Sequence, residues 1–354
     1  MRPLTATINL SHLKDNYQFL KQQHGGKTYA VIKADAYGHG AVSCARALES
    51  EADGFIVAFL EEAQELRAAG IEADIVLLEG VFEASEYAEI ERLNLSCVIQ
   101  NEKQLQEFLQ YSWKKPVCVW LKMDTGMRRA GFFPQDYVKA HQQLAQHSAV
   151  REIVKITHFS RADELSSDWT QHQTAIFDQT CAHLSGLTSL ANSAGILAHS
   201  ATHRDIGRAG IALYGISPFE DTQDFSGNLK PVMTLTSQIF GVRTLRAGES
   251  LGYGAIFTAQ QDMRIGLLAC GYADGYPRVP SNDNPVWIDG KQSRVIGRVS
   301  MDMMMVELNA PTQNIGSSVE LWGEHISVAE IARRSGTISY EVLCHVKRAH
   351  KQWI

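Results

Sequence analysis

The chain has 354 residues, of which 45% are hydrophobic and 20% charged, a composition that can bury a large core and that argues against disorder. Its net charge is −6 and it has no run of five basic residues, so it lacks the charge that attracts proteins to nucleic-acid phosphates. No stretch is apolar enough to span a membrane, and the N-terminal residues lack the apolar core of a signal peptide. We therefore expect a cytoplasmic protein with neither a nucleic-acid nor a membrane partner.

The cysteines and histidines indicate no metal site. Six cysteines are scattered along the chain without any Cys-x-x-Cys pair, which argues against a zinc site and against a secreted disulfide scaffold. The histidines show no ligand spacing either. We expect reduced, packed cysteines and no bound metal.

From the N-terminus to about residue 215, short apolar segments alternate with amphipathic helical ones, which is typical of repeated βα units. Asn101 is placed to cap the helix that follows the fourth strand. The number and length of the units favour a closed (β/α)8 TIM-like barrel over an open doubly wound sheet. The predicted strands are 28–34, 54–59, 74–80, 96–100, 117–124, 152–159, 187–193 and 204–215.

The pattern of predicted secondary structure changes after about residue 228. There β-rich segments dominate, and 328–336 is the one convincing helix. Asp289-Gly290 is a strong hairpin signal between two of these segments. The fold class is therefore α/β, with a barrel domain over residues 1–228 followed by a mostly β domain over 229–354.

In a (β/α)8 barrel the active site gathers at the carboxyl ends of the strands, and several polar residues of this chain follow strands. We expect them to converge on one face: Lys33, Arg129, His158, Asn192, Ser193 and Arg208.

Lys33 directly follows an apolar segment in AVIKADAYGHG. Taken alone, it could be a structural lysine whose ammonium reaches water. A lysine amine in a desolvated pocket can instead lose its proton and act as a nucleophile. Together with small hydroxyl residues and the glycine-flanked amides of RAGIALYG, such an amine suits a phosphate-bearing aldehyde, which describes pyridoxal phosphate.

These motifs resemble those of the alanine racemases, fold-type III pyridoxal-phosphate enzymes. AVIKADAYGHG is similar to the family's cofactor-lysine signature, and eight more motifs follow in family order between residues 30 and 344: DTGMRRAGF, THF, ANSAG, RAGIALYG, GYGAIFTA, GYADGYPR, GRVSMDMMMV and TISYEVLC. The resemblance implies reversible conversion of L-alanine and D-alanine through a pyridoxal-phosphate aldimine, either supplying D-alanine for peptidoglycan or serving alanine catabolism.

The resemblance also implies roles for single residues. Lys33 would form the cofactor Schiff base and act as one base, and Tyr253, reaching the cofactor from the partner subunit of a homodimer, would be the other. Arg208 would face the pyridine nitrogen, with His158 and Arg208 forming a polar chain behind Tyr253. The remaining cofactor-binding residues would be Tyr37, Asn192, Ser193, Tyr340 and the backbone at Gly210 and Ile211.

On the substrate side, the resemblance places Arg129 near the substrate carboxylate, and Met301 and Asp302 of the partner at the substrate entrance. A bidentate guanidinium suits an anionic group. Tyr272 and Lys122 would support the site, and Lys122 matches a position that is often carbamylated in the family.

Three residues depart from the usual family pattern, and the tail HVKRAHKQWI lacks the family's common Arg-Val-Pro-Arg run. Arg128 replaces a common glycine, Ala209 a common proline, and Gly252 a common serine. None of these changes removes a catalytic group.

Three alternatives stay open. One is a broad-specificity amino-acid racemase on the same scaffold, although such proteins are expected to carry an export signal and paired cysteines. A second is a non-catalytic pyridoxal-phosphate carrier, which resembles the barrel half alone and needs no second base. A third is an amino-acid decarboxylase of similar architecture, whose cysteine motif and glycine-rich phosphate loop are not found in this chain.

Overall fold

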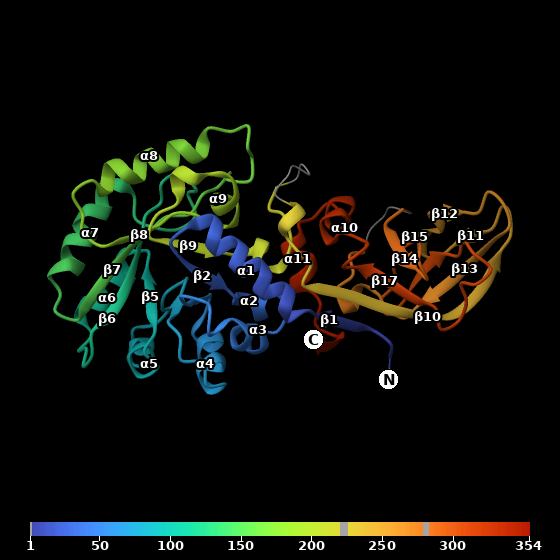
Figure 1. Ribbon diagram of the computed structural model, residues 1–354, viewed down its shortest axis with the longest axis horizontal. Coiled ribbons are helices and arrows are strands. Elements are labelled where there is room, and N and C mark those ends of the chain that lie inside the picture. Colours follow the sequence, from blue (N-terminus) through green and yellow to red (C-terminus); the bar gives the residue numbers. More distant parts are fainter. Residues whose placement is uncertain (1, 220–225, 279–282) are drawn as a thin grey trace. The chain divides into compact units, whose positions relative to one another are not determined.

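The computed structural model describes residues 2–219, 226–278 and 283–354, and the chain divides into two compact units (Figure 1). The first, called the barrel unit, comprises Leu13–Ala36 and Gly40–Lys230. The second, called the C-terminal unit, comprises the residues up to His12, Tyr37–His39 and Pro231–Ile354. Within the described ranges, no helix combines the length and the apolar composition needed to cross a bilayer.

Eight parallel strands form the sheet of the barrel unit, in the order β8-β7-β6-β5-β4-β3-β2-β9. The two ends of this order meet where the Arg208 N–H donates to the Ala191 carbonyl at 2.9 Å. This confirms the predicted barrel. The strands are β2 (Lys27–Val31), β3 (Phe55–Val57), β4 (Ile75–Leu77), β5 (Ser96–Ile99), β6 (Val117–Lys122), β7 (Val150–Ile156), β8 (Leu187–Ser189) and β9 (Ile206–Ala209).

Helices cover the outside of this sheet, as Figure 1 shows. Strands β3 to β6 are buried along their whole length, as parallel strands covered on both faces must be. The predicted helix cap is confirmed, because Asn101 Oδ1 accepts from the Gln104 N–H at 2.9 Å. The helices are α3 (Ala41–Leu48), α4 (Leu60–Ala68), α5 (Tyr87–Arg92), α6 (Glu102–Gln110), α7 (Pro134–Gln146), α8 (Trp169–Cys181) and α9 (Ser193–Ala198).

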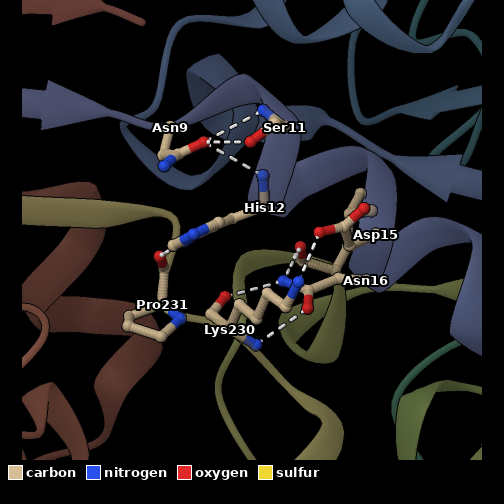
Figure 2. Close-up of polar contacts among 8 residues, drawn as sticks. Asn9, Ser11, His12, Asp15, Asn16, Lys230 and Pro231 are labelled. Carbon is tan, nitrogen blue, oxygen red and sulfur yellow. Dashed lines mark hydrogen bonds and ion pairs between the residues drawn. The ribbon is translucent and has the colours of Figure 1, made fainter.

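Helix α1 (Leu10–His24) starts in one unit and continues in the other. At its start, Asn9 Oδ1 accepts from the Ser11 and His12 backbone N–H groups, each at 3.0 Å (Figure 2). Such a side-chain acceptor satisfies helix donors that have no partner within the helix.

Farther along α1, side chains hold the end of the barrel unit. Asn16 Oδ1 accepts from the Lys230 N–H at 2.9 Å, and Asn16 Nδ2 donates to the Lys230 carbonyl at 2.8 Å (Figure 2). The Lys230 ammonium pairs with Asp15 at 2.6 Å. Both the backbone and the side chain of Lys230 are therefore fixed to the helix.

The C-terminal unit is mostly β, as predicted. Strand β10 (Met233–Leu245) pairs with both β17 (Ser318–Trp322) and β13 (Met263–Leu268), so that six strands close into a ring in the order β10-β13-β16-β15-β14-β17. The predicted hairpin is confirmed: Asp289 and Gly290, both with positive φ, join β14 (Pro285–Ile288) to β15 (Lys291–Ile296). The sixth strand is β16 (Met304–Glu307).

Two short strands extend this sheet beyond β10. Strand β1 (Thr5–Ile8) pairs antiparallel with β10, and β18 (His350–Trp353) pairs parallel with β1. The tail that departs from the family pattern thus forms the edge strand of the sheet. Helix α10 (Val328–Arg334) lies within the predicted range, and a second helix, α11 (Ser339–Cys344), follows it. A small hairpin of β11 (Ser250–Leu251) and β12 (Phe257–Thr258) flanks Tyr253.

Candidate active site

The polar residues that the sequence places at strand ends lie at the carboxyl ends of the barrel strands. Lys122 is the last residue of β6, His158 lies two residues beyond β7, and Arg208 lies within β9. Asn192 caps α9, and Ser193 is its first residue. Lys33 lies two residues beyond β2, which ends at Val31, earlier than the predicted end at residue 34.

The earlier end of β2 has a local cause. Directly after Lys33, the residues Ala34, Asp35 and Ala36 have φ values of 52°, 54° and 52°, and Tyr37 has a φ of 49°. Left-handed backbone costs L-residues about 1–2 kcal/mol each. None of these residues is glycine, so surrounding contacts must hold the turn, as is common where a backbone positions a reactive group.

The guanidinium of Arg208 is buried and almost completely hydrogen-bonded. Its Nη1 donates to the carbonyl and the hydroxyl of Ser189, at 2.9 and 2.8 Å. Its Nη2 donates to the carbonyls of Thr157 and Leu190, at 2.9 and 3.2 Å, and contacts His158. Burial lowers the pKa of Arg208 to about 10, which still leaves it charged at neutral pH. Its Nε–H has no hydrogen-bond partner in the part of the chain that the structure describes.

His158 has a defined tautomer. Because a guanidinium can only donate, His158 Nδ1, 3.3 Å from Arg208 Nη2, must be the acceptor, so the ring proton is on Nε2. Burial and the neighbouring charges of Arg208 and Arg129 hold the pKa of His158 well below its ordinary value. The imidazole is therefore neutral, with one N–H left to donate.

The setting of these groups is strongly cationic. Lys122 is only 6% exposed, and its ammonium donates to Gln100 Oε1 at 3.3 Å. Burial lowers its pKa to about 8; the carboxylate of Glu79 opposes this effect, while the charges of Arg129, Arg208 and Lys33 add to it. The structure thus brings Lys33, Lys122, Arg129 and Arg208 within electrostatic reach of one another. Arg129 is exposed and Lys33 partly so.

Ser193 lies against the backbone amides that follow β9. Ser193 is 4% exposed. Its hydroxyl oxygen accepts from the N–H groups of Gly210 and Ala212 at 2.9 and 3.3 Å. Asn192 Oδ1 accepts from the Gly195 N–H at 2.9 Å, which fixes the start of α9. Since the oxygen of Ser193 accepts from these amides, its hydroxyl proton remains as a donor for an anion beside the backbone at Gly210 and Ile211.

Two further predicted cofactor residues contact each other in the C-terminal unit. The rings of Tyr37 and Tyr340 meet edge to face with centroids 5.8 Å apart. Burial, together with Tyr340 and Cys344, raises the pKa of Tyr37, so its hydroxyl keeps its proton and can donate. Trp353 of the tail donates to the His39 carbonyl at 2.9 Å, which anchors the same segment.

The predicted second base and substrate-entrance residues lie in exposed parts of the C-terminal unit. Tyr253 is 68% exposed and Met301 55%. The Tyr272 N–H donates to the Ser300 carbonyl at 3.0 Å, tying Tyr272 to the loop of Met301. Asp302 accepts from Arg348 Nη1 at 3.2 Å.

These observations fit pyridoxal phosphate. Lys33 offers a partly exposed amine, and the hydroxyl and amides around Ser193 suit a phosphate. Arg208 has one N–H group free to meet a ring nitrogen. The surplus of positive charge suits an anionic cofactor and an anionic substrate.

Comparison with known proteins decides the family. Residues 8–218 match the sequence profile described as alanine racemase, N-terminal domain, and residues 232–353 match alanine racemase, C-terminal domain. The chain belongs to the alanine racemase family. Alanine racemases interconvert L-alanine and D-alanine, so the chain is an isomerase. The match includes the C-terminal domain, which the carrier alternative does not need.

Similar sequences support this assignment over the full length. The alanine racemase of Neisseria meningitidis serogroup C is 54% identical over all of both chains. The catabolic alanine racemase of Pseudomonas putida is 49% identical over all of this chain and 99% of that protein.

Similar structures agree. The biosynthetic alanine racemase of Pseudomonas aeruginosa superposes with a TM-score of 0.97 at 45% identity, covering all of both chains. An alanine racemase of Bartonella henselae, solved with covalently bound pyridoxal phosphate, has a TM-score of 0.91 at 28% identity, again covering both chains completely.

Two departures from the alanine racemase pattern lie at residues with positive φ. Arg128, where glycine is common, has a φ of 60°, a conformation that glycine adopts at lower cost. Gly252, where serine is common, has φ 69° and ψ −165°, a region in which almost only glycine occurs. The backbone before Tyr253 therefore differs from what a serine would favour. Nothing in the structure explains Ala209, the last residue of β9.

Sequence reasoning missed polar residues that hydrogen-bond to the backbone around His158 and Lys33. Gln173 of α8 is fully buried; its amide donates to Thr125 Oγ1 at 3.1 Å and to the His158 carbonyl at 3.2 Å, and accepts from the Ser160 N–H at 3.0 Å. Glu62 of α4 contacts the backbone next to Lys33. The signal for Glu62 was its place as the third residue of a predicted helix, where a capping carboxylate is common.

Proposed function

We propose that the chain racemises alanine with pyridoxal phosphate bound covalently to Lys33 and with Lys33 and Tyr253 as the two bases. The observation that carries this proposal is the arrangement around Arg208: a buried cation with one free N–H, next to a neutral His158 and within the field of Lys33. When bound, pyridoxal phosphate withdraws electrons from the substrate α-carbon and makes its hydrogen acidic.

Arg208 limits how far that withdrawal goes. A guanidinium that stays protonated can only donate to the ring nitrogen, so it does not produce the strong electron sink that a carboxylate partner would give. With Arg208 at the ring nitrogen, return of the proton to the α-carbon would be favoured over other reactions. Racemisation needs that restraint.

Inversion needs one base on each side of the α-carbon. Lys33 can hold or release a proton on one side, at Nζ. Tyr253 must act with a hydroxyl that ordinarily keeps its proton up to about pH 10. We propose that the free Nε2–H of His158, polarised through Nδ1 by Arg208, stabilises the phenolate of a Tyr253 from a second copy of the chain.

The remaining roles are proposed from the resemblance of the motifs to those of the alanine racemases. Ser193 and the backbone at Gly210 and Ile211, with Asn192 fixing the turn, are proposed to hold the cofactor phosphate, and Tyr37 and Tyr340 to donate to it. Arg129 is proposed to bind the substrate carboxylate. Met301, Asp302 and Tyr272 are proposed to line the path of the substrate.

We also propose that Lys122 carries a carbamate. Its lowered pKa of about 8 provides free amine, whose nitrogen would bond to the carbon of CO2 and release a proton. The resulting anion would pair with Arg129 among the surrounding cations. A protein equilibrated with 13C-bicarbonate should show a carbamate carbon resonance that Lys122→Gln abolishes; the same resonance in both proteins would refute this assignment.

We propose one of two roles in the cytoplasm, where the sequence leads us to expect the protein. The enzyme supplies D-alanine for peptidoglycan synthesis, or it serves alanine catabolism. Relatives of both kinds are similar to this chain. The broad-specificity alternative differs in one measurable respect: a panel of longer and basic amino acids should be racemised far more slowly than alanine. Comparable rates across the panel would favour that alternative.

Borohydride reduction tests the cofactor. Purified protein loaded with pyridoxal phosphate should, after reduction and proteolysis, carry the pyridoxyl group on the peptide containing Lys33, and L-alanine should become D-alanine before reduction. Label on another lysine, or bound cofactor without D-alanine, would contradict the proposal.

A mixing experiment tests the shared site. Lys33→Ala and Tyr253→Phe are each expected to be inactive, but a dimer of one with the other contains one complete site if Tyr253 comes from the partner. Dissociated and reassociated mixtures should then recover about a quarter of the wild-type activity, since half of the dimers are mixed and each has one intact site. No recovery in confirmed mixed dimers would place both bases in one chain.

A further inference from the structure

Glu62 makes contacts that link two loops at the carboxyl end of the barrel. It lies in the first turn of α4, and its Oε2 accepts from the N–H groups of Ala58 and Phe59 at 2.6 and 3.1 Å. Its other oxygen, Oε1, accepts from the N–H of Ala34 at 2.6 Å. One carboxylate thus binds the start of α4 on one side and the residue after Lys33 on the other.

The Ala34 contact controls more than one amide. The Ala34 N–H belongs to the same planar peptide group as the carbonyl of Lys33. A hydrogen bond that fixes this N–H therefore also fixes the orientation of the peptide plane that follows the Lys33 Cα. That plane leads straight into the left-handed turn of Ala34, Asp35 and Ala36, which an unrestrained chain would leave.

We propose that Glu62 is a positioning residue that aims Lys33 by holding the Ala34 amide. The inference rests on the role of Lys33 in the proposed function. Hydrogen bonds to a carboxylate are stronger than neutral ones, which suits a contact that must resist backbone relaxation. Glu62 touches neither substrate nor cofactor in this account, and acts only through the backbone of Lys33.

Glu62→Gln separates this role from simple helix capping. A glutamine amide has one acceptor oxygen and an NH2 group that cannot accept, so it can serve the Ala58 side or the Ala34 side, but not both. Glu62→Asp keeps the charge but shortens the side chain by one methylene, so it cannot span the same distance. Glu61→Gln is the matched control, because Glu61 is the adjacent carboxylate in the same turn and is exposed.

Three readouts are expected to change together in full-length Glu62→Gln. Hydrogen–deuterium exchange of the peptide containing Ala34 should quicken with and without cofactor. The rate at which pyridoxal phosphate attaches to Lys33 and the kcat for alanine should each fall by about tenfold or more, because a small misplacement of a reacting group costs that much. The KM for alanine should stay within about twofold. Glu61→Gln should match the wild type in all of them.

Attachment and kcat equal to those of Glu61→Gln would overturn the inference, even with faster exchange, since Glu62 would then be a helix cap alone. Should Glu62→Gln fail to fold, Glu62→Asp gives the same decision, with slowed attachment supporting the inference and unchanged attachment overturning it. A wild-type chain that attaches no cofactor at Lys33 would overturn both the inference and the proposed function. Attachment in the wild type without an effect of Glu62 overturns the inference alone.

Discussion

Nη2 of Arg208 lies 3.3 Å from Nδ1 of His158, so the histidine is an acceptor on its buried side and a donor on the other. Arg208 is itself held by the carbonyls of Ser189, Thr157 and Leu190. A fixed charge therefore orients a neutral ring, and the polarity of that ring, rather than its titration, is what the site uses.

This relationship predicts that glutamine can replace His158. A Gln side chain can accept from Arg208 through its oxygen and donate through its NH2, whereas leucine can do neither. We expect His158→Gln to keep kcat within about tenfold of the wild type and His158→Leu to lose about 100-fold, the lower end of the effect of one proton-transfer group. Steady-state kinetics at equal melting temperature would check this. Equal losses in the two variants would show that shape, not polarity, matters.

Ser193→Ala should weaken cofactor binding. The change leaves the N–H groups of Gly210 and Ala212 without their buried acceptor, which costs about 1–3 kcal/mol. It also removes the hydroxyl proposed to meet the phosphate. Titration of cofactor-free protein with pyridoxal phosphate should show at least about a tenfold higher Kd, which corresponds to about 1.4 kcal/mol. Ser200→Ala, at an exposed position, is the control and should bind like the wild type.

Acid should destabilise the barrel unit through His24. Burial, together with the charge of His203, lowers the pKa of His24 from 6.5 to about 4. The unfolded chain therefore binds more protons between these values, so stability is complete above about pH 6.5 and falls as pH drops towards 4. The whole shift corresponds to at most about 3 kcal/mol.

Urea unfolding at pH 7 and pH 5 measures this effect. His24→Gln should flatten the dependence of unfolding free energy on pH in that window, and the exposed His183→Gln should leave it unchanged. An identical slope in the wild type and His24→Gln would assign the acid sensitivity to other groups.

Restoring the family's serine at position 252 should harm this chain. Gly252 has a backbone conformation that costs other residues about 1–3 kcal/mol, and an added Cβ would lie 3.1 Å from Cε of Met305. We expect Gly252→Ser to lower both Tm and kcat, since Tyr253 follows directly. Gly248→Ser, at a positive φ with open space around it, should lower kcat little. A Gly252→Ser protein as stable and active as the wild type would show that the turn relaxes freely.

Most of the eight barrel strands could be predicted because they lie in short, largely apolar runs, as β6 illustrates with six buried residues. The rule that barrel sites gather at strand ends correctly brought Lys33, His158 and Arg208 to one end of the barrel. The asparagine cap of α6 and the Asp289-Gly290 hairpin followed from local chemistry alone, so they too could be predicted.

Features that depend on contacts between residues far apart in the sequence could not be predicted. The left-handed turn after Lys33 contains no glycine, and its two alanines disfavour this conformation, so it depends on partners such as Glu62 from another loop. Strand β1 is four residues long and pairs with β10 and β18, which lie far along the chain. Gln173 looks like a surface residue of an amphipathic helix until the fold buries it. The roles of Tyr253, Met301 and Asp302 stay predictions.

Isotope exchange in Tyr253→Phe tests the two-base account most directly. The variant, loaded with pyridoxal phosphate, is incubated separately with L-alanine and D-alanine in deuterated water, and α-deuteration and chirality are followed together. If Lys33 and Tyr253 act on opposite faces, one enantiomer should still exchange its α-hydrogen through Lys33 with retention, the other should not, and interconversion should be lost. Continued interconversion, or loss of exchange for both enantiomers with cofactor still bound to Lys33, would contradict the account.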